Sequence, residues 1–203
     1  MKIIELYGYS GSGKSYFAKR LKTEKYKNFY LNKMLKQNKF SRFFHKLKYL
    51  LICRKDDLIF VFRLHKYFRM ISLIGRFKNV YNFLYIIGFI KNSLKYNKPI
   101  ILDHGIFQSI FSCYIQNIDP EIINVDVELI NVYLEKLLKD ASYEVIFMNT
   151  NFHIIEKRHK QNKNNKNLAF LKKNNYKILL GYKKILSIIQ KLNYKNFNFI
   201  QIN

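Results

Sequence analysis

Residues 2–15 read KIIELYGYSGSGKS, and this stretch decides the fold. Its first part, Lys2 to Tyr7, is a short apolar run of the kind that forms a buried strand. Its second part, Gly8 to Ser15, matches the pattern G-x-x-x-x-G-K-[ST] at every fixed position. A helical pattern follows over residues 15–22. A glycine-rich loop between a strand and a helix predicts a site for phosphate groups.

The residue types in this loop suit the tail of a nucleoside triphosphate. Glycines let the main chain approach an anion where a Cβ would collide with it. The amides of residues 11–15 and the positive end of the following helix then face the β-phosphate. We expect the lysine to bridge the β- and γ-phosphates and the last hydroxyl to bind Mg²⁺. The predicted ATP-binding residues are Gly8, Gly11, Ser12, Gly13, Lys14 and Ser15, with Lys14 also catalytic and Ser15 also a metal ligand.

A second buried strand is predicted over residues 99–103, which read PIILD and end on an acid. In parallel sheets, ligands bind beyond the carboxyl ends of the strands, so Asp103 is expected at the same edge as the glycine-rich loop. We expect Asp103 to be catalytic and to act at the metal. It would hold a metal-bound water or accept the proton of an attacking hydroxyl. The alternative is a surface acid that opens a turn with His104, which we interpret as incidental.

Residues 151–167 follow a third predicted strand, at 143–148, and read NFHIIEKRHKQNKNNKN. A short helix is expected over 151–161, with Arg158 one turn after Ile154 and near the inward edge. The basic side chains continue into the next loop, so 151–167 is a candidate lid over a triphosphate. We expect Arg158 to be catalytic by stabilising the moving phosphoryl group. A solvated Lys/Asn loop is the alternative.

The rest of the chain alternates between helical and strand patterns. Helices are predicted over 106–117, over 121–139 with Asp119 and Pro120 at the start, and over 168–192. Further strands are predicted over 26–31 and 197–202. Residues 33–97 predict three helices, broken near Asp56–Asp57 and near Gly75. The sequence therefore predicts one α/β domain over 1–203, a doubly wound parallel sheet with a helical insertion (33–97) after the second strand.

The charge is strongly positive, with 37 Lys and Arg against 13 Asp and Glu and a net charge of +24. Residues 58–102 and 157–203 hold no acid at all. Such a field attracts polyanions, so weak association with nucleic acid or an anionic membrane is expected, although a Lys- and Asn-rich composition is an alternative source of the charge. Two cysteines make no disulfide framework, which favours a cytoplasmic location. No apolar run reaches the length of a membrane helix.

Together these residues resemble the P-loop nucleoside and nucleotide kinases, a group that includes thymidylate, adenylate and shikimate kinases. GYSGSGKS (8–15) matches their phosphate loop residue for residue. LDHGIFQS (102–109) stands where thymidylate kinase-like enzymes carry an Asp-Arg motif, with His104 in place of the arginine. EKRHK (156–160) stands where they carry a lid helix with an arginine. The opening and the ILDHGIFQS stretch also look like bacterial kinase-like P-loop proteins, some associated with surface-polysaccharide genes.

This resemblance implies a P-loop NTPase fold, and a kinase that uses ATP and Mg²⁺ to phosphorylate a small acceptor, above all a nucleoside or nucleotide. The acceptor would lie against helices 33–97. A kinase for a sugar or polysaccharide precursor is an alternative. A P-loop ATPase that binds nucleic acid or a membrane surface through the basic segment is another. A kinase fold that binds nucleotide without catalysis is the third.

Overall fold

The structure is a computed structural model that describes residues 1–21, 39–69, 72–161, 169–170 and 172–202. Its centre is a four-stranded sheet in the order β2-β1-β3-β4, with every neighbouring pair parallel. The strands are β1 (Lys2–Gly8), β2 (Ile100–Leu102), β3 (Ser142–Met148) and β4 (Phe197–Ile202). The sheet confirms the α/β class and four of the predicted strands. The strand predicted over 26–31 lies outside the described residues.

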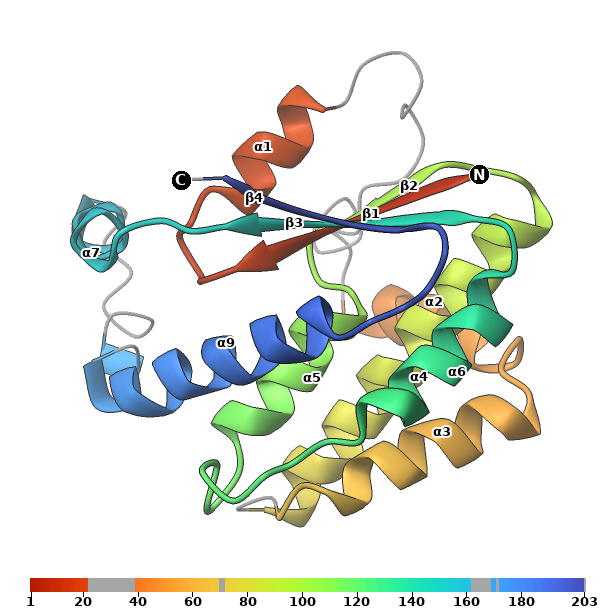
Figure 1. The fold of residues 1–203 in the computed structure, drawn as a ribbon, viewed down its shortest axis with the longest axis horizontal. Helices are drawn as coiled ribbons and strands as arrows, with labels where there is room; N and C mark the ends of the chain where they lie inside the picture. Colours follow the sequence, from red (N-terminus) through yellow and green to blue (C-terminus); the bar gives the residue numbers. More distant parts are fainter. Residues whose placement is uncertain (22–38, 70–71, 162–168, 171, 203) are drawn as a thin grey trace.

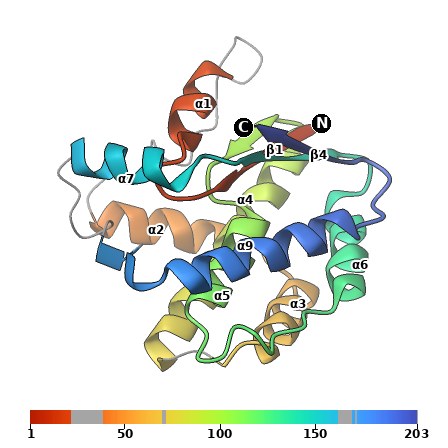
Figure 2. The same cartoon turned by 60° about the vertical axis from the view of Figure 1, so that its left-hand side comes forward.

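Helices cover both faces of this sheet, as Figures 1 and 2 show. Helix α1 (Lys14–Arg20) lies on one face, and α5 (Ile106–Ile115) and α9 (Asn175–Gln190) lie on the other. Strand β1 alternates between them: Ile4 and Leu6 join the small core with Ala18 of α1, whereas Ile3 and Tyr7 join the large core. Burial on both faces explains why β1 is a nearly continuous apolar run. The arrangement is compatible with the doubly wound fold that was predicted.

The described residues between α1 and β2 hold three helices, which form a layer on the side of the large core. They are α2 (Lys39–Leu50), α3 (Lys55–Lys66) and α4 (Leu73–Lys95). These helices agree with the three that were predicted, and their breaks fall just before Asp56–Asp57 and Gly75, close to where they were expected. Asp57 lies in the first turn of α3, where its carboxylate accepts the main-chain N–H of Arg54, and Gly75 lies in the first turn of α4. Both residues therefore mark helix starts rather than gaps.

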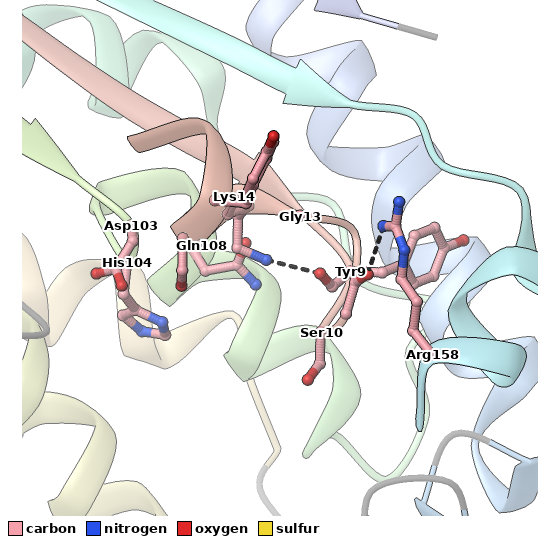
Figure 3. A pocket seen from close by; sticks show the side chains of 11 residues that line it. Tyr9, Ser10, Gly13, Lys14, Asp103, His104, Gln108 and Arg158 are labelled. Carbon is pink, nitrogen blue, oxygen red and sulfur yellow. Dashed lines mark hydrogen bonds between the residues drawn. The ribbon is translucent and has the colours of Figure 1, made fainter. Parts of the chain in front are cut away.

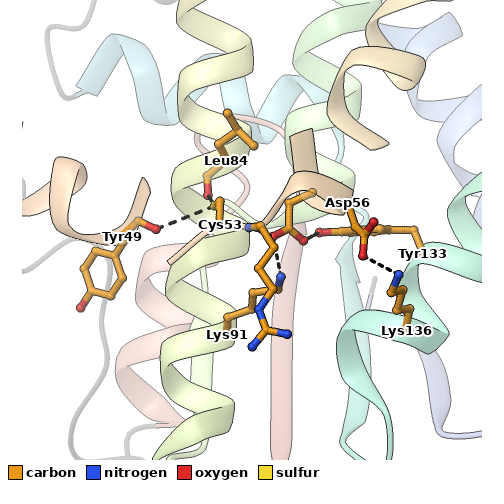
Figure 4. Close-up of polar contacts among 9 residues, drawn as sticks. Tyr49, Cys53, Asp56, Leu84, Lys91, Tyr133 and Lys136 are labelled. Atoms are coloured by element: carbon orange, nitrogen blue, oxygen red, sulfur yellow. Dashed lines mark hydrogen bonds and ion pairs between the residues drawn. The ribbon is translucent and has the colours of Figure 1, made fainter. Parts of the chain in front are cut away.

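A buried polar network ties α3 to its neighbours (Figure 4). The Asp57 carboxylate is almost completely buried, forms an ion pair with Lys91 of α4, and accepts a hydrogen bond of 2.8 Å from the Tyr133 hydroxyl. Tyr133 belongs to α6 (Val127–Leu138). Three partners satisfy a charge that would otherwise be expensive to bury, so this network fixes how α3, α4 and α6 pack.

Two predicted helix boundaries were wrong. Helix α6 begins at Val127 rather than near residue 121, because Asp126 caps it by accepting the N–H groups of Glu128 and Leu129. Asp119 and Pro120 instead lie in the connection after α5. The helix predicted over 168–192 is interrupted by a turn at Asn174, whose side chain donates to the carbonyl of Phe170. Within the described part of the chain, no helix is both long and apolar enough to cross a bilayer.

Candidate functional site

The loop between β1 and α1 is shaped by glycines with positive φ. Gly11 has a φ of 86° and Gly13 a φ of 99°, a region that other L-residues rarely adopt. Between them, the N–H of Ser12 donates to the carbonyl of Tyr9 and closes a turn. Gly13 then directly precedes Lys14, the first residue of α1. The loop thus leads directly into the first turn of α1, where main-chain N–H groups attract anions.

The main-chain carbonyls of Ser10, Gly11 and Ser12 contact side chains from the segment that follows β3 and from α7 (Phe152–Gln161). Thr150 Oγ1 donates to Ser12 O at 3.0 Å, and Arg158 Nη1 donates to Gly11 O at 2.9 Å. His159 Nε2 lies 3.1 Å from Ser10 O, which can only accept, so the ring proton sits on Nε2.

A consequence for the loop amides follows from these contacts. In a trans peptide, each C=O points away from the N–H of the next residue. The N–H groups of Gly11 and Gly13 therefore point away from the side chains that hold the carbonyls of Ser10 and Ser12. Two loop amides, those of Gly11 and Gly13, thus face the side opposite to the β3–α7 segment. The N–H of Ser12 is instead bonded to the carbonyl of Tyr9, so it does not face a ligand as was predicted for the amides of residues 11–15.

Lys14 turns back over this loop. Its Nζ atom donates to the carbonyl of Gly8 at 2.6 Å. It also donates to the carbonyl of Tyr9 at 2.7 Å, as Figure 3 shows. Burial lowers the pKa of the Lys14 ammonium to about 8, against the opposing effect of the Asp103 carboxylate. These two carbonyls hold the Lys14 ammonium beside the loop. The oxygens of a negatively charged ligand can take their place as hydrogen-bond acceptors.

A pocket of about 740 Å³ lies at this edge of the sheet. It gathers residues from the glycine-rich loop, the end of β2, α5 and α7 (Figure 3). Its lining residues are Tyr9, Ser10, Gly11, Gly13, Lys14, Ser15, Tyr16, Asp103, His104, Gln108 and Arg158. The structure therefore brings together six of the eight residues predicted for the site.

The other two predicted residues, Gly8 and Ser12, belong to the loop but do not line the pocket. The N–H of Gly8 donates to Gln108 Oε1 at 3.3 Å. The Ser12 hydroxyl is buried and has no hydrogen-bond partner among the described residues. A Cβ on Gly8 would lie 2.9 Å from Met148 O and 3.0 Å from Ser12 Oγ, so glycine is needed there for space.

The pocket offers oxygen ligands of the type that Mg²⁺ prefers. Asp103 contributes a carboxylate and Ser15 a hydroxyl, and both line the pocket with Lys14. In nucleotide sites Mg²⁺ takes one or two protein ligands and completes its shell with phosphate oxygens and water. No group of three His, Cys, Asp or Glu that could hold a metal occurs among the described residues. Two oxygen groups are within the number of ligands that Mg²⁺ takes from a protein in such sites.

His104 is the pocket residue that the sequence interpretation treated as incidental. Burial lowers the pKa of its imidazole to about 4, and the positive charges of Lys14 and Lys46 act in the same direction. The ring is therefore neutral at neutral pH. It lines the same pocket as Lys14 and Asp103, and it adds a hydrogen-bonding group without adding charge.

Glu5, which sequence reasoning missed, does not line the pocket but positions the helix start next to it. Its fully buried carboxylate accepts the main-chain N–H groups of Phe107 and Gln108, at 3.2 and 2.8 Å, and the Tyr143 hydroxyl at 2.6 Å. These bonds attach the N-terminal end of α5 to β1, directly after the turn that carries Asp103. A lone acid inside an apolar strand was the available signal. Gln108, Thr150 and His159 had no comparable signal in the sequence.

Part of the predicted lid is described and part is not. Helix α7 confirms the helix predicted over 151–161. The predicted inward edge was wrong, because Ile155 and His159 are the buried residues of α7, whereas Ile154 and Arg158 are exposed. The exposed Arg158 side chain still lines the pocket. Lys160 on the same helix pairs with Glu156 rather than with the loop. The lysines at 163 and 166 lie outside the described residues.

No protein-family model matches the chain, and no curated protein matches it either. Inference about function therefore depends on the pocket and its residues.

Proposed function

We propose that this chain is an ATP-dependent phosphotransferase, a P-loop kinase that transfers the γ-phosphoryl group to a small acceptor, above all a nucleoside or nucleotide. One observation carries the proposal. Lys14, Asp103 and Arg158 come from the start of α1, the end of β2 and α7, and all three line one pocket. A lysine, a carboxylate and an arginine around a glycine-rich loop are the groups that phosphoryl transfer uses.

In the proposed complex, the triphosphate lies on the amide side of the loop. Lys14 exchanges its bonds to Gly8 O and Tyr9 O for phosphate oxygens, and it places its charge between the β- and γ-phosphates. The N-terminal end of α1 adds its favourable dipole to the same anion. Ser15 and Asp103 would hold the Mg²⁺, which supplies charge neutralisation on the β- and γ-oxygens.

During transfer, the bond from the γ-phosphorus to the bridging oxygen breaks, and a bond to the acceptor oxygen forms. A nucleoside acceptor attacks through a hydroxyl, whose proton passes to Asp103 as the alternative to the role of Asp103 at the metal. A nucleotide acceptor attacks through an oxygen of its ionised phosphate and has no proton to lose. ADP leaves with the electrons of the broken bond. Arg158 is bonded to Gly11 O in this structure and moves to the transferring group, where its charge stabilises the transition state.

A transfer screen tests the proposal and resolves the acceptor class. The protein is incubated with γ-labelled ATP and Mg²⁺ and with panels of nucleosides, nucleoside monophosphates, sugars and polynucleotides. We expect labelled product with a nucleoside or nucleotide, and none with the Lys14→Ala variant. Product with a sugar would retain the kinase and change its acceptor. If the label were released only as inorganic phosphate, and only in the presence of polynucleotide, the protein would be a polyanion-dependent ATPase rather than a kinase.

A further inference from the structure

A group of large apolar side chains is exposed at the N-terminal end of α4. Leu73 is 73% exposed, Ile74 82% and Phe77 74%. Ile118, in the connection between α5 and α6, is 54% exposed. These four residues are called the apolar corner below. Single exposed apolar side chains are ordinary, but three large ones within five positions of one helix mark an interaction surface.

The apolar corner is held in place by hydrogen bonds and packing. Ser72 Oγ accepts the N–H of Gly75 at 3.0 Å and caps α4, which fixes the turn that carries Leu73 and Ile74. A Cβ on Gly75 would lie 3.1 Å from Gln116 Oε1, so this turn lies against the end of α5. Figures 1 and 2 show both segments at the same end of the helical layer, away from the sheet.

Positive charge surrounds the apolar corner. Arg76 and Lys78 are exposed on α4 beside Phe77, and Arg69 is exposed where its carbonyl accepts the N–H of Ile118 at 2.9 Å. Lys177 of α9 adds a fourth cation, because its Nζ donates to the carbonyl of Ile118. The described connection from α5 to α6, which carries Ile118, holds three acids, Asp119, Glu121 and Asp126. Glu121 accepts a hydrogen bond from the Tyr176 hydroxyl, and Asp126 caps α6. Cations therefore outnumber acids at the corner.

We propose that the apolar corner docks the protein on the surface of an anionic lipid bilayer. Leucine, isoleucine and phenylalanine enter the boundary between headgroups and acyl chains, and the surrounding cations bind lipid phosphates. Nucleic acid offers no apolar phase to these side chains. A second copy of the chain would bring the same cations and a net charge of +24 against its own. The bilayer is the partner that matches both features, and this inference does not depend on the proposed kinase activity.

The absence of tryptophan from the sequence allows a direct test. In the Phe77→Trp variant, all tryptophan fluorescence comes from the corner. We expect its emission to shift to the blue on addition of vesicles of phosphatidylglycerol and phosphatidylcholine, and the shift to disappear at high salt. The control is Val132→Trp, at a residue 54% exposed on α6, which should show no shift.

Sedimentation with the same vesicles provides a second readout. Removing two apolar side chains in Leu73→Ser/Ile74→Ser should weaken partitioning by about tenfold or more, whereas Val132→Ser should not change it. Three results would overturn the proposal. They are equal binding to vesicles of phosphatidylcholine alone, a blue shift of Phe77→Trp that grows with protein concentration without lipid, and no shift with anionic vesicles. The second result would assign the corner to a second copy.

Discussion

The Glu5 carboxylate and the main-chain N–H of Gln108 form a 2.8 Å hydrogen bond between residues 103 positions apart in the sequence. Glu5 lies in the middle of β1, and Gln108 lies in the first turn of α5. Asp103 and His104 lie just before the first residue of α5. The Gln108 side chain also contacts β1, because its Oε1 atom accepts a hydrogen bond from the N–H of Gly8. One buried carboxylate thus sets the position of two sides of the pocket.

This carboxylate gives the fold a specific dependence on pH. Burial raises the pKa of Glu5 from 4.5 to about 7, against the hydrogen bonds that it accepts. The folded protein therefore holds a proton that the unfolded chain releases between these values. The stabilisation is complete below about pH 4.5 and is lost as the pH rises through about 7. The shift corresponds to roughly 3 kcal/mol.

Urea unfolding of the wild type and of Glu5→Gln at several pH values measures this effect. The amide does not titrate, so the stability of the wild type relative to the variant should fall between pH 4.5 and pH 7.5. A difference that stays constant across this range would show that Glu5 keeps the same protonation in the folded and unfolded states.

Gly105 is expected to tolerate no side chain. A Cβ at this position would lie 2.4 Å from Glu5 Cδ and 2.5 Å from Glu5 Oε2. Gly105→Ala should therefore destabilise the protein by about 1–3 kcal/mol, as overpacking of a buried site does. In the Glu5→Ala background, the same substitution should cost much less, because the colliding carboxylate is absent. Additive effects in this double-mutant cycle would contradict the contact.

Breaking the buried ion pair between Lys91 and Asp57 is expected to lower the free energy of unfolding more than breaking an exposed ion pair. Lys91→Met leaves a buried Asp57 carboxylate without its cation and should lower the free energy of unfolding by about 3–5 kcal/mol. The matched control is Lys136→Met, which removes the partner of Asp56 in an ion pair exposed on both sides. That variant should unfold at nearly the wild-type urea concentration. Equal losses in both variants would refute the distinction.

Arg158 is expected to act on transfer rather than on folding. Its exposed guanidinium reaches the pocket, so Arg158→Ala should reduce the rate of phosphoryl transfer by about 100-fold or more. Lys157, exposed on the same helix, provides the control, and Lys157→Ala should transfer at the wild-type rate. Circular dichroism and thermal unfolding of the two variants should coincide. A wild-type transfer rate in Arg158→Ala would remove Arg158 from the reaction.

The sheet edge could be predicted because its signals are local. The apolar runs of β1, β2 and β3, and the glycines between β1 and α1, each specify their structure within a few residues. The carboxyl ends of parallel strands meet at one edge, so the sequence alone predicts Asp103 at the same edge as the glycine-rich loop.

The residues that support the site could not be predicted, because their contacts span the chain. His159 and Thr150 hold the carbonyls of Ser10 and Ser12 across 149 and 138 positions. No periodicity or spacing carries such information. The start of α6 was misplaced for a different reason. Asp119 and Asp126 are both N-cap residue types, and only the structure shows which of them accepts helix amides.

Isothermal titration of the protein with ATP and Mg²⁺ tests the central claim, that the loop from Gly8 to Ser15 binds a triphosphate. We expect wild-type protein and Lys19→Ala, a change of an exposed lysine on α1, to bind with equal affinity. Lys14→Ala should lose measurable binding. If Lys14→Ala bound ATP and Mg²⁺ as tightly as the wild type, the loop would not be the nucleotide site, and the proposed kinase would be wrong.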